Sequence, residues 1–476
     1  MHIPILKHPQ IQRAKQTLKL TASRLVDNHI NLAVTGLSGS GKTAFITSLV
    51  NQLTEANEQA YLPFFSVLSE QRLIGVRRDV QPNLTFNRFA YEQAMSDLTE
   101  SPAKWPASTT GVSQIRLKIK YRNVKGLSQY LVDDSTLTLD ITDYPGEWLL
   151  DLPLLDMNFE QWIVHCDGEL TDTRRAKLAL EFLQALENVD FSAKADELVL
   201  EKVAGLYRQY LQQCQFEGYQ LIQPSRFILP GELANAPVLH FFPIPQVLIE
   251  NHRLNLSNPP SGSNLAVIIS RFEQYKEAVV KPFYKHHFRH FDRQIILVDC
   301  LSALNHGHSS FQDLQKALDW LMRSFQYGPS NIINRLFEPK IDKLVFAASK
   351  ADHITPDQQV NLIKLLDNML RHARKKIQFD GVVSESTAIS AIRASKSGFS
   401  KVNGEDIPTL RGVNSNGELI TLYPGEVPTA CPSLDFWQQQ RFEFPKFMPP
   451  ELVNSYALPH IRMDQVLDFL LADKLR

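Results

Sequence analysis

The order of apolar and polar positions predicts an α/β chain that begins with a helix, a strand and a second helix. Apolar residues recur at helical spacing over residues 10–27 and again after Thr43, in the sequence AFITSLVNQL. Between these segments, residues 30–34 form the short apolar run of a buried strand, which ends abruptly in GLSGSGKT. The expected order is therefore helix, strand, glycine loop, helix.

The middle of the chain alternates at first and then becomes helical. Residues 115–121 and 135–143 alternate apolar and polar positions on either side of a polar segment, which predicts an antiparallel pair of strands. Residues 172–188 and 193–214 have the periodicity of amphipathic helices, whereas residues 220–262 are rich in Pro, Asn and Phe and fit neither pattern. Together these segments indicate a long insertion.

Two later segments, residues 294–300 and 343–348, are nearly continuous apolar runs. Such runs suit parallel strands that are covered on both faces. The remaining pattern predicts helices at 311–325 and 356–375, a last strand within 381–392, a β-rich or irregular stretch at 407–450 and a closing helix at 463–475.

Composition and charge exclude several classes of protein. The formal net charge is -1, so the chain lacks a global basic field and nucleic acid is not expected as a partner. The four cysteines lie far apart, which predicts reduced thiols in a cytoplasmic protein rather than a zinc site or disulfides. No stretch approaches ~20 consecutive apolar residues, so no transmembrane segment is expected. Peripheral association with the inner membrane stays open, because a docking surface leaves little trace in sequence.

The segment from Gly36 to Thr43 fits the P-loop pattern G-x-x-x-x-G-K-[ST] at every fixed position. Its glycines let successive backbone N–H groups turn into one concavity, and the helix that follows adds its positive end. In such a loop Lys42 reaches the β- and γ-phosphates and the Thr43 hydroxyl binds Mg²⁺. A plain glycine-rich turn is the alternative, but the flanking strand and helix favour phosphate binding. The predicted phosphate-binding residues are Gly36, Ser38, Gly39, Ser40, Gly41, Lys42, Thr43 and Ala44.

A second motif, D-Y-P-G, directly follows the alternating strand. At the end of a strand beside a P-loop, the Asp143 carboxylate can hold Mg²⁺ through water, and the N–H of Gly146 can sense the γ-phosphate. The alternative is a simple turn, since Asp, Pro and Gly all favour turns. A switch threonine that binds Mg²⁺ is expected in the loop before residue 115, where Thr110 is favoured over Thr109.

A third motif, S-K-A-D at residues 349–352, follows an apolar strand and predicts recognition of guanine. In a [NT]-K-x-D loop the Asp352 carboxylate accepts two hydrogen bonds from guanine, a donor pair that adenine lacks, and the Lys350 stem lies over the ring. A charged loop end is the alternative. Residues 193–196 have the same K-x-D letters, but their polar helical surroundings indicate a solvated face.

A short segment after the last predicted strand completes the candidate site. It contains a Ser-Ala pair of the kind whose backbone N–H groups bind the guanine O6. The predicted residues are Ser390, Ala391 and Ile392.

In this order, the motifs resemble the GTPase branch of P-loop proteins. The sequences GLSGSGKTAFITSLV, DITDYPGEWLLDLPLL and SKADHI, with the large insertions, resemble more closely the YcjX-like proteins of Gram-negative bacteria. The resemblance covers the whole chain. It implies binding of GTP and GDP with Mg²⁺, slow hydrolysis, a link to the stress response and an effector protein that the sequence does not identify.

Two details depart from the Ras-like pattern. Glu147 stands where Ras-like proteins carry a water-orienting Gln, and a carboxylate beside the γ-phosphate predicts slow hydrolysis. Ser349 replaces the usual Asn or Thr, so weaker bracing between this loop and the P-loop is expected. The segment before the switch threonine offers candidates for an internal arginine finger, with surface charge as the alternative. These candidates are Arg72, Arg77 and Arg78.

The sequence thus predicts a P-loop nucleoside triphosphatase of the α/β class, with a Ras-like mixed sheet flanked by helices. The predicted core comprises residues 1–155 and 291–400, the mainly helical insertion residues 156–290, and the C-terminal extension residues 401–476. The expected function is a slow, Mg²⁺-dependent GTPase switch in which Lys42, Thr110, Gly146 and Glu147 act in catalysis and Thr43, Thr110 and Asp143 organise the metal. Two alternatives remain, a P-loop ATPase and a nucleotide-binding scaffold without significant hydrolysis.

Overall fold

The computed structural model describes most of the chain. The described residues are 28–55, 62–81, 84, 86–108, 111–124, 134–323, 341–371, 374–375, 381–439, 441–452 and 457–476. The helix predicted over residues 10–27 lies outside these ranges, as do Thr109 and Thr110.

A mixed sheet organises the core, with the strand order β2-β4-β5-β1-β6-β7-β8. The central strand β1 (His29–Gly36) runs parallel to its neighbours β5 and β6, and β7 and β8 continue the parallel part. Strand β4 is antiparallel to both β5 and β2, as the alternating pattern predicted for β4 and β5. The other bounds are β2 (Leu73–Asp79), β3 (Asn87–Arg88, beside β4), β4 (Ser113–Arg122), β5 (Asp134–Asp143), β6 (Arg293–Val298), β7 (Lys343–Ala348) and β8 (Val383–Ala388).

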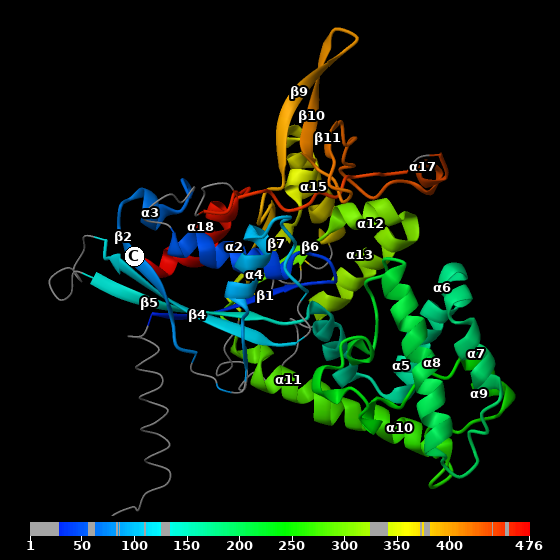
Figure 1. The fold of residues 1–476 in the computed structure, drawn as a ribbon. Coiled ribbons are helices and arrows are strands. Elements are labelled where there is room, and N and C mark those ends of the chain that lie inside the picture. Colours follow the sequence, from blue (N-terminus) through cyan, green and yellow to red (C-terminus); the bar gives the residue numbers. More distant parts are fainter. Residues whose placement is uncertain are drawn as a thin grey trace, which may run out of the picture.

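Both faces of the parallel part are covered, which explains the continuous apolar runs. Along β7, Leu344 and Phe346 pack into one hydrophobic cluster, whereas Val345 and Ala347 pack into another. Successive side chains of a strand point to opposite faces, so a strand that is buried on both sides is apolar throughout. The prediction of a Ras-like mixed sheet with helices on both faces is confirmed (Figure 1).

One face of the sheet is covered by α2 (Lys42–Thr54) and by the closing helix α18 (Met463–Leu471). Leu467 and Leu470 of α18 are fully buried in the same cluster as the β1 side chains. The predicted C-terminal extension therefore contributes one helix to the hydrophobic cluster that includes β1. Shorter helices nearby are α3 (Ser66–Ser69) and α4 (Tyr91–Thr99).

The opposite face carries a much larger cluster that continues into the helical insertion. It includes α12 (Cys300–His306), α13 (His308–Arg323) and α15 (Gln359–Met369) beside the sheet. The main elements of the insertion are α5 (Phe159–Leu170), α6 (Thr173–Leu178), α7 (Leu180–Glu187), α8 (Glu197–Phe216), α9 (Gln246–Asn251), α10 (Asn264–Tyr275), the π-helix η6 (Lys276–Val280) and α11 (Lys281–His286) (Figure 1).

The K-x-D sequence at residues 194–196 is a helix start. The Asp196 side chain accepts a hydrogen bond from the Leu198 N–H and caps α8. Asp and Asn are favoured at this position because their side chains satisfy N–H groups that the helix leaves open. A structural role therefore explains this carboxylate, as the surrounding pattern indicated.

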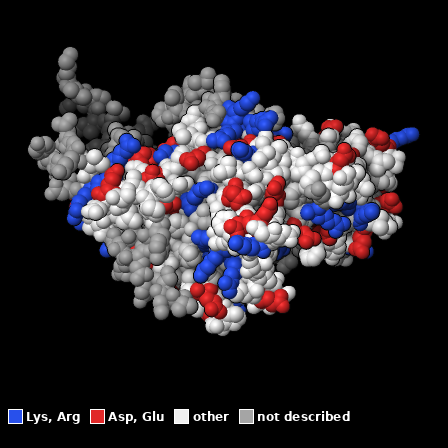
Figure 2. All heavy atoms as spheres, turned by 90° about the horizontal axis from the view of Figure 1, so that it is seen from above, with Lys and Arg blue, Asp and Glu red and all other residues white. Residues whose placement is uncertain are grey.

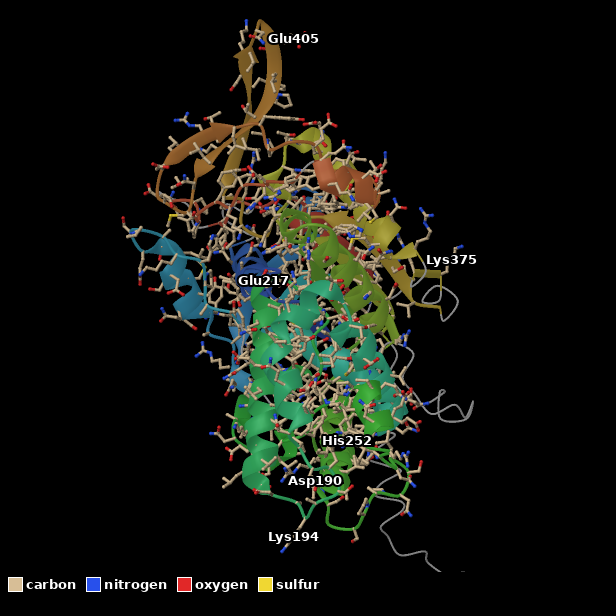
Figure 3. All side chains as sticks on the ribbon, turned by 90° about the vertical axis from the view of Figure 1, so that its right-hand side faces the viewer. Asp190, Lys194, Glu217, His252, Lys375 and Glu405 are labelled. Carbon is tan, nitrogen blue, oxygen red and sulfur yellow. The ribbon has the colours of Figure 1, made fainter. Side chains whose placement is uncertain are left out.

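A β-arm projects from the core opposite the insertion. Strands β9 (Ser395–Val402) and β10 (Glu405–Val413) form a hairpin, which β11 (Leu419–Leu422) extends. Figure 3 shows Glu405 at the tip of this arm and Lys194 at the other end of the molecule. The prediction of β-rich structure over 407–450 is confirmed for β10 and β11, and α17 (Leu434–Gln439) follows them.

Positive and negative side chains are intermixed over the face shown in Figure 2, in line with the net charge of -1. Among the described residues, no helix combines the length and the hydrophobicity that crossing a bilayer requires.

The packing of α18 generates a stability prediction. Replacement of Leu467 by Ala removes a fully buried side chain between α18 and the sheet, so we expect a loss of about 2–5 kcal/mol in unfolding free energy. Urea denaturation followed by circular dichroism would measure it. Leu198→Ala is the control, since Leu198 is 75% exposed. An equal effect of both changes would contradict the placement of α18 in the core.

Candidate nucleotide-binding site

The P-loop leaves β1 through backbone that only glycine tolerates. A Cβ atom on Gly36 would lie 2.6 Å from the Leu297 carbonyl oxygen, and Gly39 and Gly41 have φ angles of +74° and +87°. Other residues rarely adopt positive φ angles, because their Cβ atoms crowd the backbone. Strand β1 and helix α2 therefore connect through a narrow turn that encloses space for a ligand.

The N-terminus of α2 is open to that space. Gly41 is its N-cap and no side chain caps it, which leaves the first-turn N–H groups as donors with the positive end of the helix dipole behind them. The Lys42 ammonium donates to the Gly36 carbonyl at 2.6 Å, across the loop. The Thr43 hydroxyl donates to the Ala107 carbonyl at 3.0 Å. The chain just before the predicted switch threonines therefore contacts the start of α2.

The D-Y-P-G segment lies against the P-loop. Asp143 ends β5 and pairs in register with Val34 of β1. A Cβ atom on Gly146 would lie 2.7 Å from the Gly36 carbonyl carbon, so the missing side chain at Gly146 lets the two loops come into backbone contact. Tyr144 is fully buried and its hydroxyl accepts a hydrogen bond from Gln294 at 2.9 Å. The contact places Gly146 next to the loop that it was predicted to act with.

After Gly146 the chain forms the 3-10 helix η2 (Gly146–Asp156), most of which is buried in the insertion. The Leu150 carbonyl accepts a hydrogen bond from the Trp320 indole at 2.7 Å. The Asp151 carboxylate accepts from the Ser225 hydroxyl at 2.6 Å and from the Tyr275 hydroxyl. Burial raises the pKa of Asp151 to about 6. No pattern in the sequence indicates that the segment after the D-Y-P-G motif is enclosed in this way.

Glu147 is 8% exposed and lines a cavity that the P-loop also lines. Its Oε2 atom has no hydrogen-bond partner among the described residues. Buried polar atoms are nearly always satisfied, so an unpaired carboxylate oxygen at a cavity wall is typical of a site that binds water or a ligand.

The S-K-A-D loop follows β7. Asp352 is 4% exposed, and its Oδ2 accepts a hydrogen bond from the Ala394 N–H at 2.8 Å. Lys350 has a left-handed backbone with φ of 61°, and its ammonium pairs with Asp299 at the end of β6. Ser349 bonds through its N–H to the Val298 carbonyl at 2.9 Å. Among the described residues, its hydroxyl also bonds to Val298 and not to the P-loop.

The predicted Ser390–Ile392 segment lies directly beside this loop. The Ala351 N–H donates to the Ile389 carbonyl at 2.9 Å, which ties the two loops together. Ser390 pairs with Ile461 through two backbone hydrogen bonds of 3.2 and 2.8 Å, so the residues before α18 hold the segment from behind. Within the described part of the chain, the N–H groups of Ala391 and Ile392 have no acceptor.

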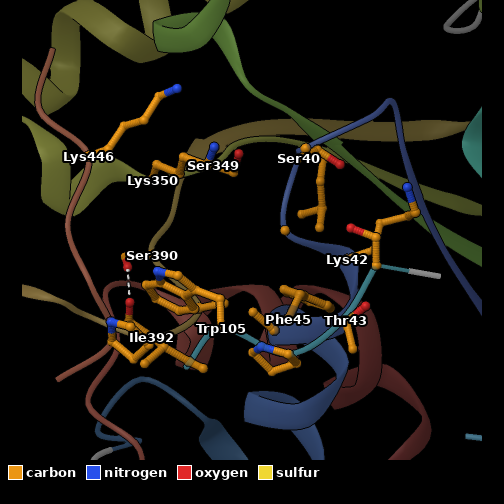
Figure 4. A pocket seen from close by; sticks show the side chains of 18 of the residues that line it. Ser40, Lys42, Thr43, Phe45, Trp105, Ser349, Lys350, Ser390, Ile392 and Lys446 are labelled. Carbon is orange, nitrogen blue, oxygen red and sulfur yellow. Dashed lines mark hydrogen bonds between the residues drawn. The ribbon is translucent and has the colours of Figure 1, made fainter. Parts of the chain in front are cut away.

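One cavity of about 670 Å³ connects these loops (Figure 4). Three of the predicted residues do not line it: Gly36 and Gly146 pack against one another, and Asp143 lines a neighbouring cavity that shares Thr43 and Ser108 with the first. Thr110 lies outside the described residues. The predicted residues that line it are Ser38, Gly39, Ser40, Gly41, Lys42, Thr43, Ala44, Glu147, Lys350, Asp352, Ser390, Ala391 and Ile392.

Several residues in the cavity wall belong to no motif in the sequence. Trp105 and Lys446 line the cavity (Figure 4). Phe447 and Met448 line it too. Trp105 is anchored by its indole N–H, which donates to the Phe447 carbonyl at 2.9 Å. Trp105 lies in the loop where the switch threonine was expected, but nothing in the sequence pairs that loop with residues more than three hundred positions later.

The strand, glycine loop and helix, together with the parallel strands whose ends surround the cavity, define a Ras-like P-loop protein. The YcjX-like family, DUF463, matches residues 30–475, and the chain belongs to this family. It is 44% identical over 467 residues to a Ras-like GTPase YcjX of Escherichia coli (strain K12), covering 98% of this chain and 100% of that protein. It is 45% identical over 481 residues to a Ras-like GTPase YcjX of Shewanella oneidensis, covering 98% of each chain.

The backbone contact between Gly36 and Gly146 generates a second prediction. Gly146→Ala forces a methyl group against the Gly36 backbone, so we expect a loss of about 1–3 kcal/mol in stability and weaker nucleotide binding. Urea denaturation and calorimetric titration would measure the two effects. The control is Gly205→Ala in α8, where a Cβ atom meets nothing within 4 Å and should stabilise the helix by about 0.5–1 kcal/mol. Unchanged stability of the Gly146→Ala variant would show that the contact is not tight.

Proposed function

We propose that the protein binds GTP with Mg²⁺, hydrolyses it slowly to GDP and phosphate, and acts as a nucleotide-dependent switch. The observation that carries the proposal is the single cavity with the P-loop at one end and the S-K-A-D and Ser390–Ile392 loops at the other. The names of the two relatives, each a Ras-like GTPase, support it.

The phosphate end combines charge with directed donors. The uncapped N-terminus of α2 presents backbone N–H groups, and the Lys42 ammonium lies across the same loop on the Gly36 carbonyl. Phosphate oxygens accept hydrogen bonds from such groups and are attracted by both the dipole and the ammonium. Lys42 would exchange the carbonyl for the β- and γ-phosphates when nucleotide binds.

The base end supports guanine over adenine. Asp352 is held by the Ala394 N–H through Oδ2, and its Oδ1 accepts no hydrogen bond within the described residues. A rigid buried carboxylate would accept the N1–H and 2-amino donors of guanine, whereas adenine would leave it unpaired at a high cost. The N–H groups of Ala391 and Ile392 would donate to the guanine O6. Lys350 is neutralised by Asp299, so its aliphatic stem is available along the base.

The residues around Thr43 fit a magnesium ion. Mg²⁺ prefers oxygen ligands and takes few of them from protein, and the Thr43 hydroxyl and the Asp143 carboxylate line one cavity. Thr43 and Asp143, with Thr110 as the proposed switch residue, would hold the ion. When bound, it neutralises charge on the β- and γ-phosphates.

Glu147 is the proposed water-orienting group. Its unpaired Oε2 can accept a hydrogen bond from a water molecule at the cavity wall. Its negative charge in a buried position repels the γ-phosphate, and this supports slow hydrolysis. In the reaction the water oxygen bonds to the γ-phosphorus, the bond to the bridging oxygen breaks, and GDP takes that electron pair.

The burial of η2 supports the switch. If Gly146 moves when the γ-phosphate leaves, the attached helix must move against the insertion, because its side chains are packed there. An effector protein would then bind the surface of the insertion in one nucleotide state and not in the other. A role in the stress response belongs to this proposal through the family resemblance alone, and a cytoplasmic location through the widely spaced cysteines. The proposal leaves room for peripheral contact with the inner membrane.

Guanine recognition gives the third prediction. We expect Asp352→Asn to lose GTP and GDP affinity by about 10²-fold or more, because two hydrogen bonds to a carboxylate are lost, and to gain affinity for xanthosine nucleotides. Calorimetry with GTP, GDP, ATP, ADP and XTP would measure it. Asp357→Asn is the control, as Asp357 is exposed just after the same loop. Equal affinity of the wild type for adenine and guanine nucleotides would defeat guanine recognition and favour an ATPase.

The fourth prediction concerns hydrolysis of GTP. In single-turnover assays with enzyme in excess, the wild type should release phosphate from GTP, and Lys42→Ala should not, because the ammonium that stabilises the developing charge is gone. Equal release by both proteins would leave a nucleotide-binding scaffold as the remaining function.

A further inference from the structure

The insertion brings an arginine to the neighbouring cavity. This cavity has a volume of about 740 Å³, lies between the core and the insertion, and shares Thr43 and Ser108 with the nucleotide cavity. Asp143 lines it from the core side and Arg226 from the insertion side. Arg226 thus faces the space that holds the proposed Mg²⁺ and γ-phosphate ligands.

The backbone of Arg226 is fixed by its two neighbours. The Ser225 N–H and hydroxyl donate to Asp151 at 3.0 and 2.6 Å, and Phe227 is buried. The guanidinium carbon lies 3.2 Å from the centre of the Trp148 ring, a cation–π contact. Because Trp148 and Asp151 belong to η2, Arg226 is attached to the helix that starts at Gly146 and Glu147.

Arg226 is half-buried, and among the described residues its guanidinium forms no close ion pair, although the Asp151 and Glu232 carboxylates attract it over a longer distance. Two other arginines of the insertion differ: Arg175 pairs with Asp313, and Arg271 pairs with Glu197. A partly desolvated guanidinium is stabilised by an anion, and its planar donors match a phosphate group. The site of such an anion would be the shared cavity.

We propose that Arg226 is a catalytic residue, an arginine supplied in cis by the insertion, which contacts the γ-phosphate of bound GTP. The assignment rests on the proposed GTPase function. As the water oxygen bonds to the γ-phosphorus and the bridging bond breaks, charge develops on the oxygens, and the guanidinium donates hydrogen bonds to them. The water proton passes to the released phosphate.

The arginines that the sequence offered for this role lie elsewhere. Arg72 pairs with Glu70 at 2.7 Å and bonds the Leu475 carbonyl, and Arg78 pairs with Glu92. Together with Arg77 they belong to β2 or its start, and none lines either cavity. An arginine from the insertion could not be chosen from the sequence, because its approach to the P-loop depends on how η2 packs.

The test compares Arg226→Ala and Arg226→Lys with Arg271→Ala, an insertion arginine that lines neither cavity. We expect single-turnover hydrolysis to fall at least about 10²-fold in Arg226→Ala, since such arginines contribute 10³–10⁵-fold elsewhere. Arg226→Lys should fall at least about tenfold, because a point charge replaces the planar donors. The affinity for GDP should stay within threefold of wild type, and binding of aluminium fluoride with GDP, a mimic of the transition state, should be lost. Arg271→Ala should match wild type in each assay.

The outcomes separate two failures. If wild type and Lys42→Ala release phosphate equally, the GTPase function itself fails. If the wild type hydrolyses GTP and either Arg226 variant, folded by circular dichroism, hydrolyses it at the wild-type rate, the arginine assignment alone is overturned. If an Arg226 variant loses both GDP binding and aluminium fluoride binding, the role of Arg226 is to stabilise the structure through Trp148, and the catalytic assignment is overturned.

Discussion

The contact between Gly36 and Gly146 is the constraint on which the rest of the site depends. A Cβ atom on Gly146 would overlap the Gly36 backbone, so the D-Y-P-G loop can approach the P-loop only without a side chain at this position. A Cβ atom on Gly36 would overlap the Leu297 carbonyl oxygen, so the P-loop is held equally close to β6. The approach of the two loops fixes the end of β5 beside the end of β1. It also sets the direction in which η2 leaves the core, and therefore where the insertion lies.

From that contact, packing and hydrogen bonds extend into the insertion. Asp151, inside η2, receives hydrogen bonds from Ser225 and Tyr275, and Trp320 holds the Leu150 carbonyl. Burial raises the pKa of the Asp151 carboxyl to about 6, even though the hydrogen bonds from Ser225 and Tyr275 favour its charged form. A polar network of this kind joins the segment next to the P-loop to elements of the insertion, so motion at one end has a physical path to the other.

The base end of the cavity is built differently. Asp352 is positioned by the Ala394 N–H at the root of the β-arm, and the Ser390–Ile392 segment is braced by Ile461 just before α18. The C-terminal residues thus complete a site whose phosphate end lies near the N-terminus. Lys446 and Trp105 lie in the walls between them.

The sequence by itself determined the elements and the order of the motifs. The buried strands β1, β6 and β7, the antiparallel pair β4 and β5, and the glycine loop follow from local patterns, because burial and backbone conformation act on neighbouring residues. The family and the Ras-like fold were also readable, because spaced motifs survive divergence. The roles of the individual site residues remain predictions, although the structure brings most of them to one cavity.

Tertiary structure alone decided which distant residues contact the motifs. Contacts between distant segments bury η2 and bring Trp105 to Phe447. They also brace Ser390 with Ile461 and bring Arg226 to the cavity beside Thr43. Apolar side chains in these segments carry no mark of their partner, since hydrophobic burial is non-directional. Which surfaces line the cavity is therefore decided only when the two large hydrophobic clusters pack.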